Sequence, residues 1–241
     1  MNVATTLAFD TATSELTVAV FADDGSLIAE REVAAGEDGR PRHANALLPA
    51  IEEAVGASGT WNCVTGIVVG VGPGAFTGLR IGVATARALS QARGVTLKGI
   101  SSLAMLAAGV PRAVAERERP RLAMLDARRG EVFAALYDEA GEMAWPAAVG
   151  APEALAERIG ALPGKPVAVG DGAVRFRDQL AGAGATIPPD GDPAHRLRAR
   201  HAWGIAAHLQ GSPPSKIEPN YLRRPDAELW RERDHKAKSS A

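Results

Sequence analysis

The chain has 241 residues, 46% of them hydrophobic, which is long enough for two units of roughly 100 to 120 residues with their own cores. Its 27 Lys and Arg nearly balance 28 Asp and Glu, and a formal net charge of -1 argues against direct, salt-driven binding of nucleic acid. The single cysteine, Cys63, excludes an intrachain disulfide framework and a cysteine-based metal site. No signal peptide or membrane-spanning stretch is apparent, so we expect a cytoplasmic protein without membrane association.

The first half of the chain is predicted to form βββαβα and one further strand. Alternating apolar residues indicate three antiparallel strands, and a helical spacing around Pro49 indicates a helix. A continuous β-branched run then predicts a strand buried on both faces, ahead of a glycine turn and a second helix. The predicted elements are strands 3–9, 16–21 and 27–33, helix 43–55, strand 64–71, helix 77–93 and strand 96–100.

The second half is predicted to repeat this plan in a degenerate form. The expected elements are helix 102–115, an antiparallel meander over 121–145, helix 152–159, strand 167–169 and helix 194–209. Residues 7–25 recur at 123–141, where an aspartate, a glutamate and a turn glycine keep their places: Asp10, Glu15 and Gly25 match Asp126, Glu131 and Gly141. This repeat predicts two copies of one unit, 1–101 and 102–224, followed by a charged, disordered tail over 225–241.

Two loops are candidates for binding phosphate. The glycine-rich turn 72–78 lies between a strand and a helix, but Leu79 follows where a P-loop needs lysine, so a tight structural turn is favoured. Asp10, Thr11 and Thr13 lie at the first hairpin, where an actin-like ATPase has a phosphate loop and where an aspartate could organise hydrated magnesium. Ala12 replaces the glycine that would let phosphate approach the backbone. We therefore expect a degenerate phosphate loop, or a turn that these side chains merely close.

The sequence offers no other carrier of catalysis. No two histidines are spaced i and i+4, no nucleophile elbow occurs, and Cys63 has no histidine near it in sequence. We predict no metal site and no catalytic residue. An independent actin-like ATPase or kinase that uses Asp10 and Asp126 is the alternative.

The predicted helix 77–93 has more apolar surface than a single buried stripe requires. Arg80, Arg87 and Gln91 form one narrow polar stripe, and most other side chains are small or apolar. This pattern favours packing against a protein partner, with burial between the two units as the alternative. We expect Val83→Glu to break such a complex without unfolding the domain.

Several segments closely resemble the TsaB (YeaZ) family, the dimerisation subunit of the bacterial tRNA threonylcarbamoyladenosine machinery. They are residues 7–13, His43 with 47–49, 70–82, 126–133 and 218–223. The resemblance implies a duplicated actin-like ATPase fold of the ribonuclease-H type, in the α/β class. It also implies a scaffold role beside the catalytic paralogue TsaD and the ATPase TsaE, with tRNA reached only through the complex and modified at adenosine 37.

The resemblance also implies where partners and cofactors bind. The His-x-x-x-His metal motif of the catalytic paralogue is missing, since Leu47 follows His43 at the fourth place. Two helices of the first unit are expected to pack against the paralogue; their candidate residues are His43, Leu47, Leu48, Ile51, Gly78, Arg80, Val83 and Arg87. No cofactor is expected to bind tightly, and ATP or ADP with magnesium is considered only at the interface with the catalytic partner. A homodimer through the same helices is a further alternative.

Overall fold

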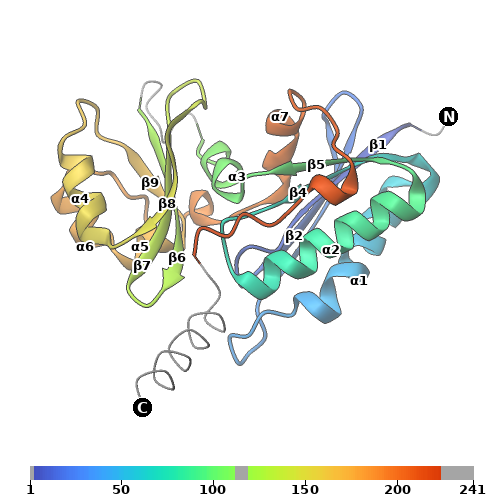
Figure 1. The fold of residues 1–241 in the computed structure, drawn as a ribbon, viewed down its shortest axis with the longest axis horizontal. Helices are drawn as coiled ribbons and strands as arrows, with labels where there is room; N and C mark the ends of the chain where they lie inside the picture. The colour runs from blue at the N-terminus through green and yellow to red at the C-terminus, as the bar shows by residue number, and fades with distance from the viewer. Residues whose placement is uncertain (1–2, 112–118, 224–241) are drawn as a thin grey trace, which may run out of the picture.

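The computed structural model describes residues 3–111 and 119–223, which form two sheets side by side (Figure 1). The first sheet has the strand order β3-β2-β1-β4-β5 and the second the order β8-β7-β6-β9. In both sheets an antiparallel meander is extended by a parallel strand, so the second repeats the first without its last strand. The strands are β1 (Thr5–Asp10), β2 (Leu16–Ala22), β3 (Leu27–Val33), β4 (Val64–Gly70), β5 (Thr96–Ile100), β6 (Arg121–Arg128), β7 (Glu131–Tyr137), β8 (Met143–Gly150) and β9 (Val167–Val169).

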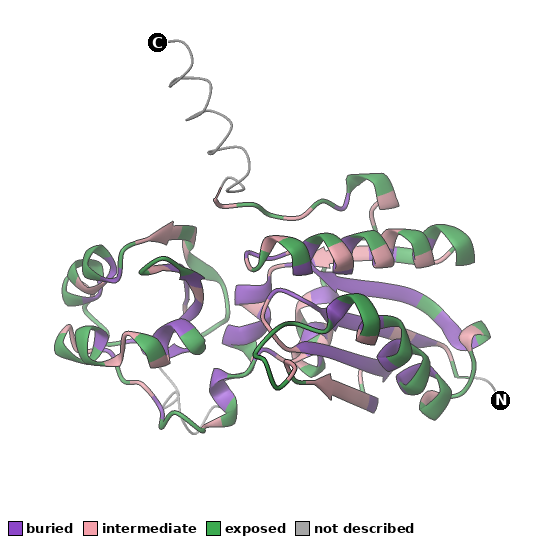
Figure 2. Ribbon diagram, turned by 90° about the horizontal axis from the view of Figure 1, so that it is seen from below, coloured by how far each residue is buried: buried purple, intermediate pink, exposed green. Residues whose placement is uncertain are grey.

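Helices cover the outer faces of the sheets and fill the space between them. On the first sheet lie α1 (His43–Ser58) and α2 (Phe76–Arg93), and on the second α4 (Pro152–Gly160), α5 (Asp171–Arg175) and α6 (Arg177–Gly182). Between the sheets lie α3 (Ser102–Ala108) and α7 (Ala202–Ala206). Exposed residues follow the outer sides of the helices, whereas the strands behind them are mostly buried (Figure 2). Short 3-10 turns complete the fold: η1 (Trp61–Cys63), η2 (Pro193–His195), η3 (Ala199–His201) and η4 (Pro214–Lys216).

The central core belongs to both sheets. Ala8, Ala19 and Phe21 of the first sheet join Leu125 and Phe133 of the second in one buried cluster. Separate clusters lie under the outer helices of each sheet. Because burial of apolar surface is the main force that stabilises a fold, this shared cluster fixes how the two sheets sit against each other.

The predicted elements agree with the structure except in the second half. The strands 27–33, 96–100 and 167–169 have their predicted bounds. The helix predicted over 102–115 ends at Ala108, because Gly109 follows and Pro111 cannot continue it. Two helices over 171–182, α5 and α6, were not predicted. Residues 112–118 and the predicted tail lie outside the described residues.

The helix predicted over 194–209 is also wrong. The structure has η2, η3 and the short α7 there instead. Arg196 and Arg198 have extended backbone angles, and both form ion pairs with Glu32 of β3. These tertiary contacts override the helical preference of an alanine- and arginine-rich sequence.

The internal repeat is present, but one strand of the second copy is shifted by one residue. Thr17 lies opposite Asp10, and the matching Phe133 lies opposite Leu125 rather than Asp126. A register irregularity between Asp126 and Arg128 absorbs the extra residue, with positive φ at Arg128. Side chains along a strand alternate between its two faces, so a shift of one residue puts the side chains of β6 that precede Arg128 on the opposite face. Asp10 and Asp126 therefore face opposite sides of their sheets.

The C-terminal strap, residues 212–223, returns to the first sheet although the predicted division assigns it to the second unit. Ser212 pairs with Leu97 of β5, and the Asn220 N–H donates to the Val71 carbonyl at 2.7 Å. At its end Arg223 donates to Glu131 of β7 at 2.8 Å. The strap thus connects the two sheets, and Figure 1 shows it running above α2 toward the second sheet.

Candidate functional site

A cavity of about 240 Å³ lies between the two halves. It is lined by residues 12–14, 74–76, 125–128 and 220–223, together with Pro41, Phe133 and Asp171. Its walls therefore come from the first hairpin, the start of α2, the end of β6 and the C-terminal strap. The volume is below the roughly 300–1,000 Å³ of common small-molecule sites, so the cavity could enclose only part of a nucleotide.

The predicted phosphate loop contributes little to this cavity. Asp10 is 1% exposed; its Oδ1 accepts from the Ala12 N–H and its Oδ2 from the Ser102 hydroxyl, both at 2.6 Å. The Thr11 hydroxyl is buried and donates to the Gly78 carbonyl at 2.8 Å. Of the three predicted residues, only Thr13 lines the cavity.

Asp10 is a junction between three segments of the fold. Its partner Ser102 begins α3, and the Ser102 hydroxyl oxygen also accepts from the Gly72 N–H at 3.1 Å. Burial raises the pKa of Asp10 to about 6, although the hydrogen bonds from Ser102 and Ala12 act in the opposite direction. The carboxylate therefore holds β1, α3 and the glycine turn together.

The glycine-rich turn serves the packing of α2 against the first hairpin. A side chain at Gly78 would lie 2.1 Å from the Thr11 carbonyl oxygen, and one at Gly82 would lie 2.2 Å from Thr11 Oγ1. His43 of α1 reaches the same hairpin, because its Nε2 donates to the Thr13 carbonyl at 2.8 Å. Burial lowers the pKa of His43 and so favours the neutral ring. These contacts support the structural interpretation of the turn.

Acidic and basic groups alternate at the second-half side of the cavity. Asp126 accepts two hydrogen bonds from Arg175 of α5, each 2.8 Å long, and lies 3.5 Å from the Arg128 guanidinium. The Asp126 N–H donates to Asp171 at 2.8 Å, and burial is the main cause that raises the pKa of Asp171. Asp126 is a residue that the sequence pointed to, whereas Arg175 was not predicted, because the short helix that carries it was not predicted either.

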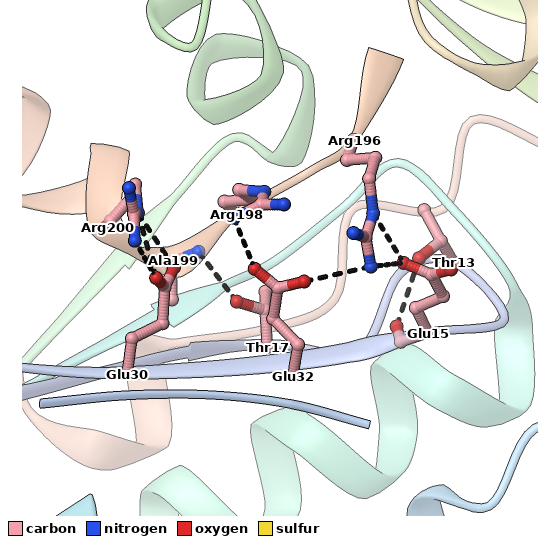
Figure 3. Close-up of polar contacts among 9 residues, drawn as sticks. All are labelled: Thr13, Glu15, Thr17, Glu30, Glu32, Arg196, Arg198, Ala199 and Arg200. Carbon is pink, nitrogen blue, oxygen red and sulfur yellow. Dashed lines mark hydrogen bonds and ion pairs between the residues drawn. The ribbon is translucent and has the colours of Figure 1, made fainter. Parts of the chain in front are cut away.

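A second cavity of about 340 Å³ adjoins the first and shares Thr13, Ser14, Leu125 and Asp171 with it. Beside it runs a row of ion pairs between residues 196–200 and the inner face of the first sheet (Figure 3). We call this row the arginine ladder; it consists of Arg196 with Glu15 and Glu32, Arg198 with Glu32, and Arg200 with Glu30. The Ala199 N–H also donates to the Thr17 hydroxyl at 2.9 Å. The ladder fastens the segment before α7 to the first sheet.

Comparison with known proteins gives the family. The family model "TsaD: tRNA N6-adenosine threonylcarbamoyltransferase" matches residues 37–176. The chain is 35% identical over 225 residues to the tRNA threonylcarbamoyladenosine biosynthesis protein TsaB of Escherichia coli K12, covering 90% of this chain and 94% of that protein. The chain belongs to the TsaB (YeaZ) family.

Solved structures of TsaB-family proteins agree with this fold. YeaZ from Pseudomonas aeruginosa matches with a TM-score of 0.72 and 27% identity, over 91% of this chain and 100% of that one. A 73-residue segment is also 41% identical to TsaB of Bacillus subtilis, covering 30% of this chain and 29% of that protein. The resemblance stated from the sequence and the duplicated actin-like α/β fold are thereby confirmed.

In this TsaB-family chain, the helices predicted to bind a partner protein are α1 and α2. They expose fewer of the predicted contact residues than the sequence suggested. Buried in the protein's own interior are His43, Leu47, Ile51, Gly78 and Val83. Leu48 is 53% exposed, Arg80 is exposed and Arg87 is half-buried. The prediction for Val83→Glu is wrong in one respect, because Val83 is 2% exposed and a carboxylate there would unfold the domain.

Two further properties bear on this TsaB-family chain. Among the residues that the structure describes, no three His, Cys, Asp or Glu side chains gather as metal ligands would. Within the same ranges, no helix has the length and apolar character needed to cross a membrane.

Proposed function

We propose that this chain is a non-catalytic subunit that binds and activates a TsaD-like catalytic paralogue in threonylcarbamoyl modification of tRNA adenosine 37. The relatives support the pathway, because one is named for threonylcarbamoyladenosine biosynthesis and the matching family model for the transferase. The observation that carries the proposal is the outer face of α1 and α2, on which Leu48 and Arg80 are exposed. Arginine is enriched at protein interfaces, and an exposed leucine on the same helical face adds an apolar contact.

The alternative of an independent ATPase or kinase needs Asp10 and Asp126 to act in one place. Asp10 is buried against Ser102, whereas Asp126 is bonded to Arg175, and only Asp126 lines the cavity. These residues do not fit a magnesium nucleotide held by this chain alone. We therefore propose that ATP or ADP with magnesium binds, where it is used, at the interface with the catalytic partner.

The test is a pair of matched substitutions on exposed leucines. Leu48→Glu should weaken binding to the purified TsaD-like paralogue at least about 10-fold in calorimetry, because it places a charge at the centre of the proposed interface. Leu27→Glu on β3, a site 40% exposed, is the control and should bind as the wild type does. Both variants should keep the wild-type melting temperature. Unchanged binding by Leu48→Glu would contradict the proposed surface.

The other expected partners follow from the same proposal. A TsaE-like ATPase and tRNA would join only once the complex with the paralogue has formed, in the cytoplasm. Light scattering measures whether the chain alone is a monomer or a homodimer. A homodimer through the same helices should separate when the paralogue is added, because the paralogue would bind the same surface. Hydrolysis of ATP by the isolated chain would instead favour the alternative.

A further inference from the structure

We propose that Arg80 is a preorganised contact for a carboxylate of the partner protein, and that Tyr221 of the C-terminal strap positions it through Phe76. The inference rests on the proposed function, because it names the chemistry that the α1–α2 surface presents to its partner. It also gives the strap a role in binding, although the strap lies more than 100 residues after α2 in the sequence.

The charges of α2 leave Arg80 available. The helix holds Arg80, Arg87 and Arg93 but no Asp or Glu. Among the residues that the structure describes, Arg80 forms no ion pair, whereas Arg175, Arg196, Arg198, Arg200 and Arg223 near the two cavities do. An exposed guanidinium without an ion-pair partner can donate to a carboxylate from outside without first losing an internal partner.

Aromatic rings hold the Arg80 side chain in place. Its guanidinium carbon lies 5.3 Å from the centre of the Phe76 ring, within the range of a cation–π contact. The Phe76 ring in turn packs on Tyr221, with the ring centres 4.8 Å apart and the planes tilted by 36°. Three side chains, Arg80, Phe76 and Tyr221, thus form one stack at the first turn of α2.

The strap fixes the far end of this stack. Tyr221 is flanked by Asn220, which is bonded to Val71, and is followed by Leu222, packed on the central core. Arg223 then pairs with Glu131 of the second sheet. Because the residues on either side of Tyr221 are fixed by these contacts, its ring can support Phe76 although Tyr221 itself is 41% exposed. A side chain ordered before binding loses less conformational freedom when the complex forms.

The surroundings favour a protein carboxylate over a phosphate backbone. Ala84 and Ala88, also exposed on α2, leave room for a partner helix to approach closely. Exposed Leu48 on α1 offers an apolar contact, and exposed Glu52 of α1 would repel a polyanion. The occupant we infer is a helix of the TsaD-like paralogue that carries an aspartate or glutamate facing Arg80.

The test measures binding of the full chain to the purified paralogue at two salt concentrations. Arg80→Ala should weaken binding about 10-fold and make it less sensitive to salt. Tyr221→Ala should weaken it about 3-fold with the same loss of salt sensitivity, and Tyr221→Phe, which keeps the ring, should bind as the wild type does. The matched control is Arg93→Ala, because Arg93 lies at the other end of α2 and stacks on Trp61 at 5.0 Å.

The double variant separates positioning from a merely structural role. If Tyr221 acts through Arg80, Arg80→Ala combined with Tyr221→Ala should bind no more weakly than Arg80→Ala alone. Additive losses, or wild-type binding by Arg80→Ala, would overturn the inference while the proposed function stands. Failure of the wild-type chain to bind the paralogue would instead overturn the proposed function.

Discussion

The turns at Asp10 and at Asp126 occupy matching places in the two halves of the chain but have different surroundings. Each aspartate accepts a hydrogen bond from the backbone N–H two residues later, at Ala12 and at Arg128. Asp10 then bonds to Ser102 inside the protein, whereas Asp126 bonds to Arg175 beside the cavity. The local turn chemistry is the same in both halves, and the tertiary partner is not.

The difference shows how a one-residue shift can separate the roles of two copies. Asp10 lies opposite Thr17, on the face of the first sheet that meets the second. Asp126 lies on the outer face of the second sheet, toward α5, because the register shift precedes Arg128. A duplicated acidic residue therefore does not become a catalytic pair when the duplicated strands differ in register.

Replacing each aspartate by alanine should give the largest contrast. Asp10→Ala leaves the Ala12 N–H and the Ser102 hydroxyl without their acceptor in the interior, and should lower the free energy of unfolding by about 3 kcal/mol. Asp126→Ala breaks pairs with the more exposed Arg175 and Arg128, and should lower it by about 1 kcal/mol. Urea unfolding of both variants measures the difference. Equal losses would show that burial does not distinguish the two turns.

The pH dependence of stability should differ between wild type and Asp10→Asn. The pKa of Asp10 is about 6 in the folded protein and about 3.8 when it is unfolded, so the folded state binds the proton more tightly. The contribution of Asp10 is therefore most favourable below pH 4 and is lost as the pH rises through 6, by about 3 kcal/mol in total. Unfolding free energies measured from pH 4 to pH 7 should show this loss in the wild type relative to Asp10→Asn. A constant difference between the two proteins across that range would mean that the pKa of Asp10 is not raised.

Local patterns in the sequence predicted the first sheet well. The strands 27–33 and 96–100 could be placed because alternation and turn residues act over short distances. The segment 194–209 could not, because its conformation depends on Glu30 and Glu32, more than 160 residues earlier in the chain. Likewise, the register shift at Asp126 leaves the composition of the repeat unchanged and is visible only in strand pairing.

The candidate site was predicted in part. The sequence pointed separately to the first hairpin and to the glycine-rich turn before α2, and parts of both line the same cavity. The pattern of α2, however, could not show which apolar residues its own sheet would bury. Val83 and Ile51 are core residues, whereas Leu48 and Arg80 are exposed. Tyr221 was within a segment that resembled the family, yet its contact with Phe76 required the path of the strap.

The smallest expected changes in stability come from replacing glutamates that pair with arginines of the C-terminal part. Glu15 and Glu131 match in the repeat, and both bind an arginine from the C-terminal part, Arg196 and Arg223. Glu32, which accepts from Arg196 and Arg198, pairs with Thr17 of β2, and the matching position in the second sheet is Val149, which pairs with Phe133 of β7. Among the described residues, the ladder therefore belongs to the first sheet alone. Because Glu32 and Arg198 are only 23% and 20% exposed, Glu32→Gln should lower the free energy of unfolding by about 1 kcal/mol.

The matched change Glu131→Gln affects a single pair and should lower the free energy of unfolding by about 0.5 kcal/mol or less. Urea unfolding with and without added sodium chloride measures both variants. Salt should reduce the loss caused by Glu32→Gln, because screening weakens the ladder in the wild type. If Glu131→Gln were the more destabilising change, the strap rather than the ladder would be the stronger ionic connection between the C-terminal part and the sheets.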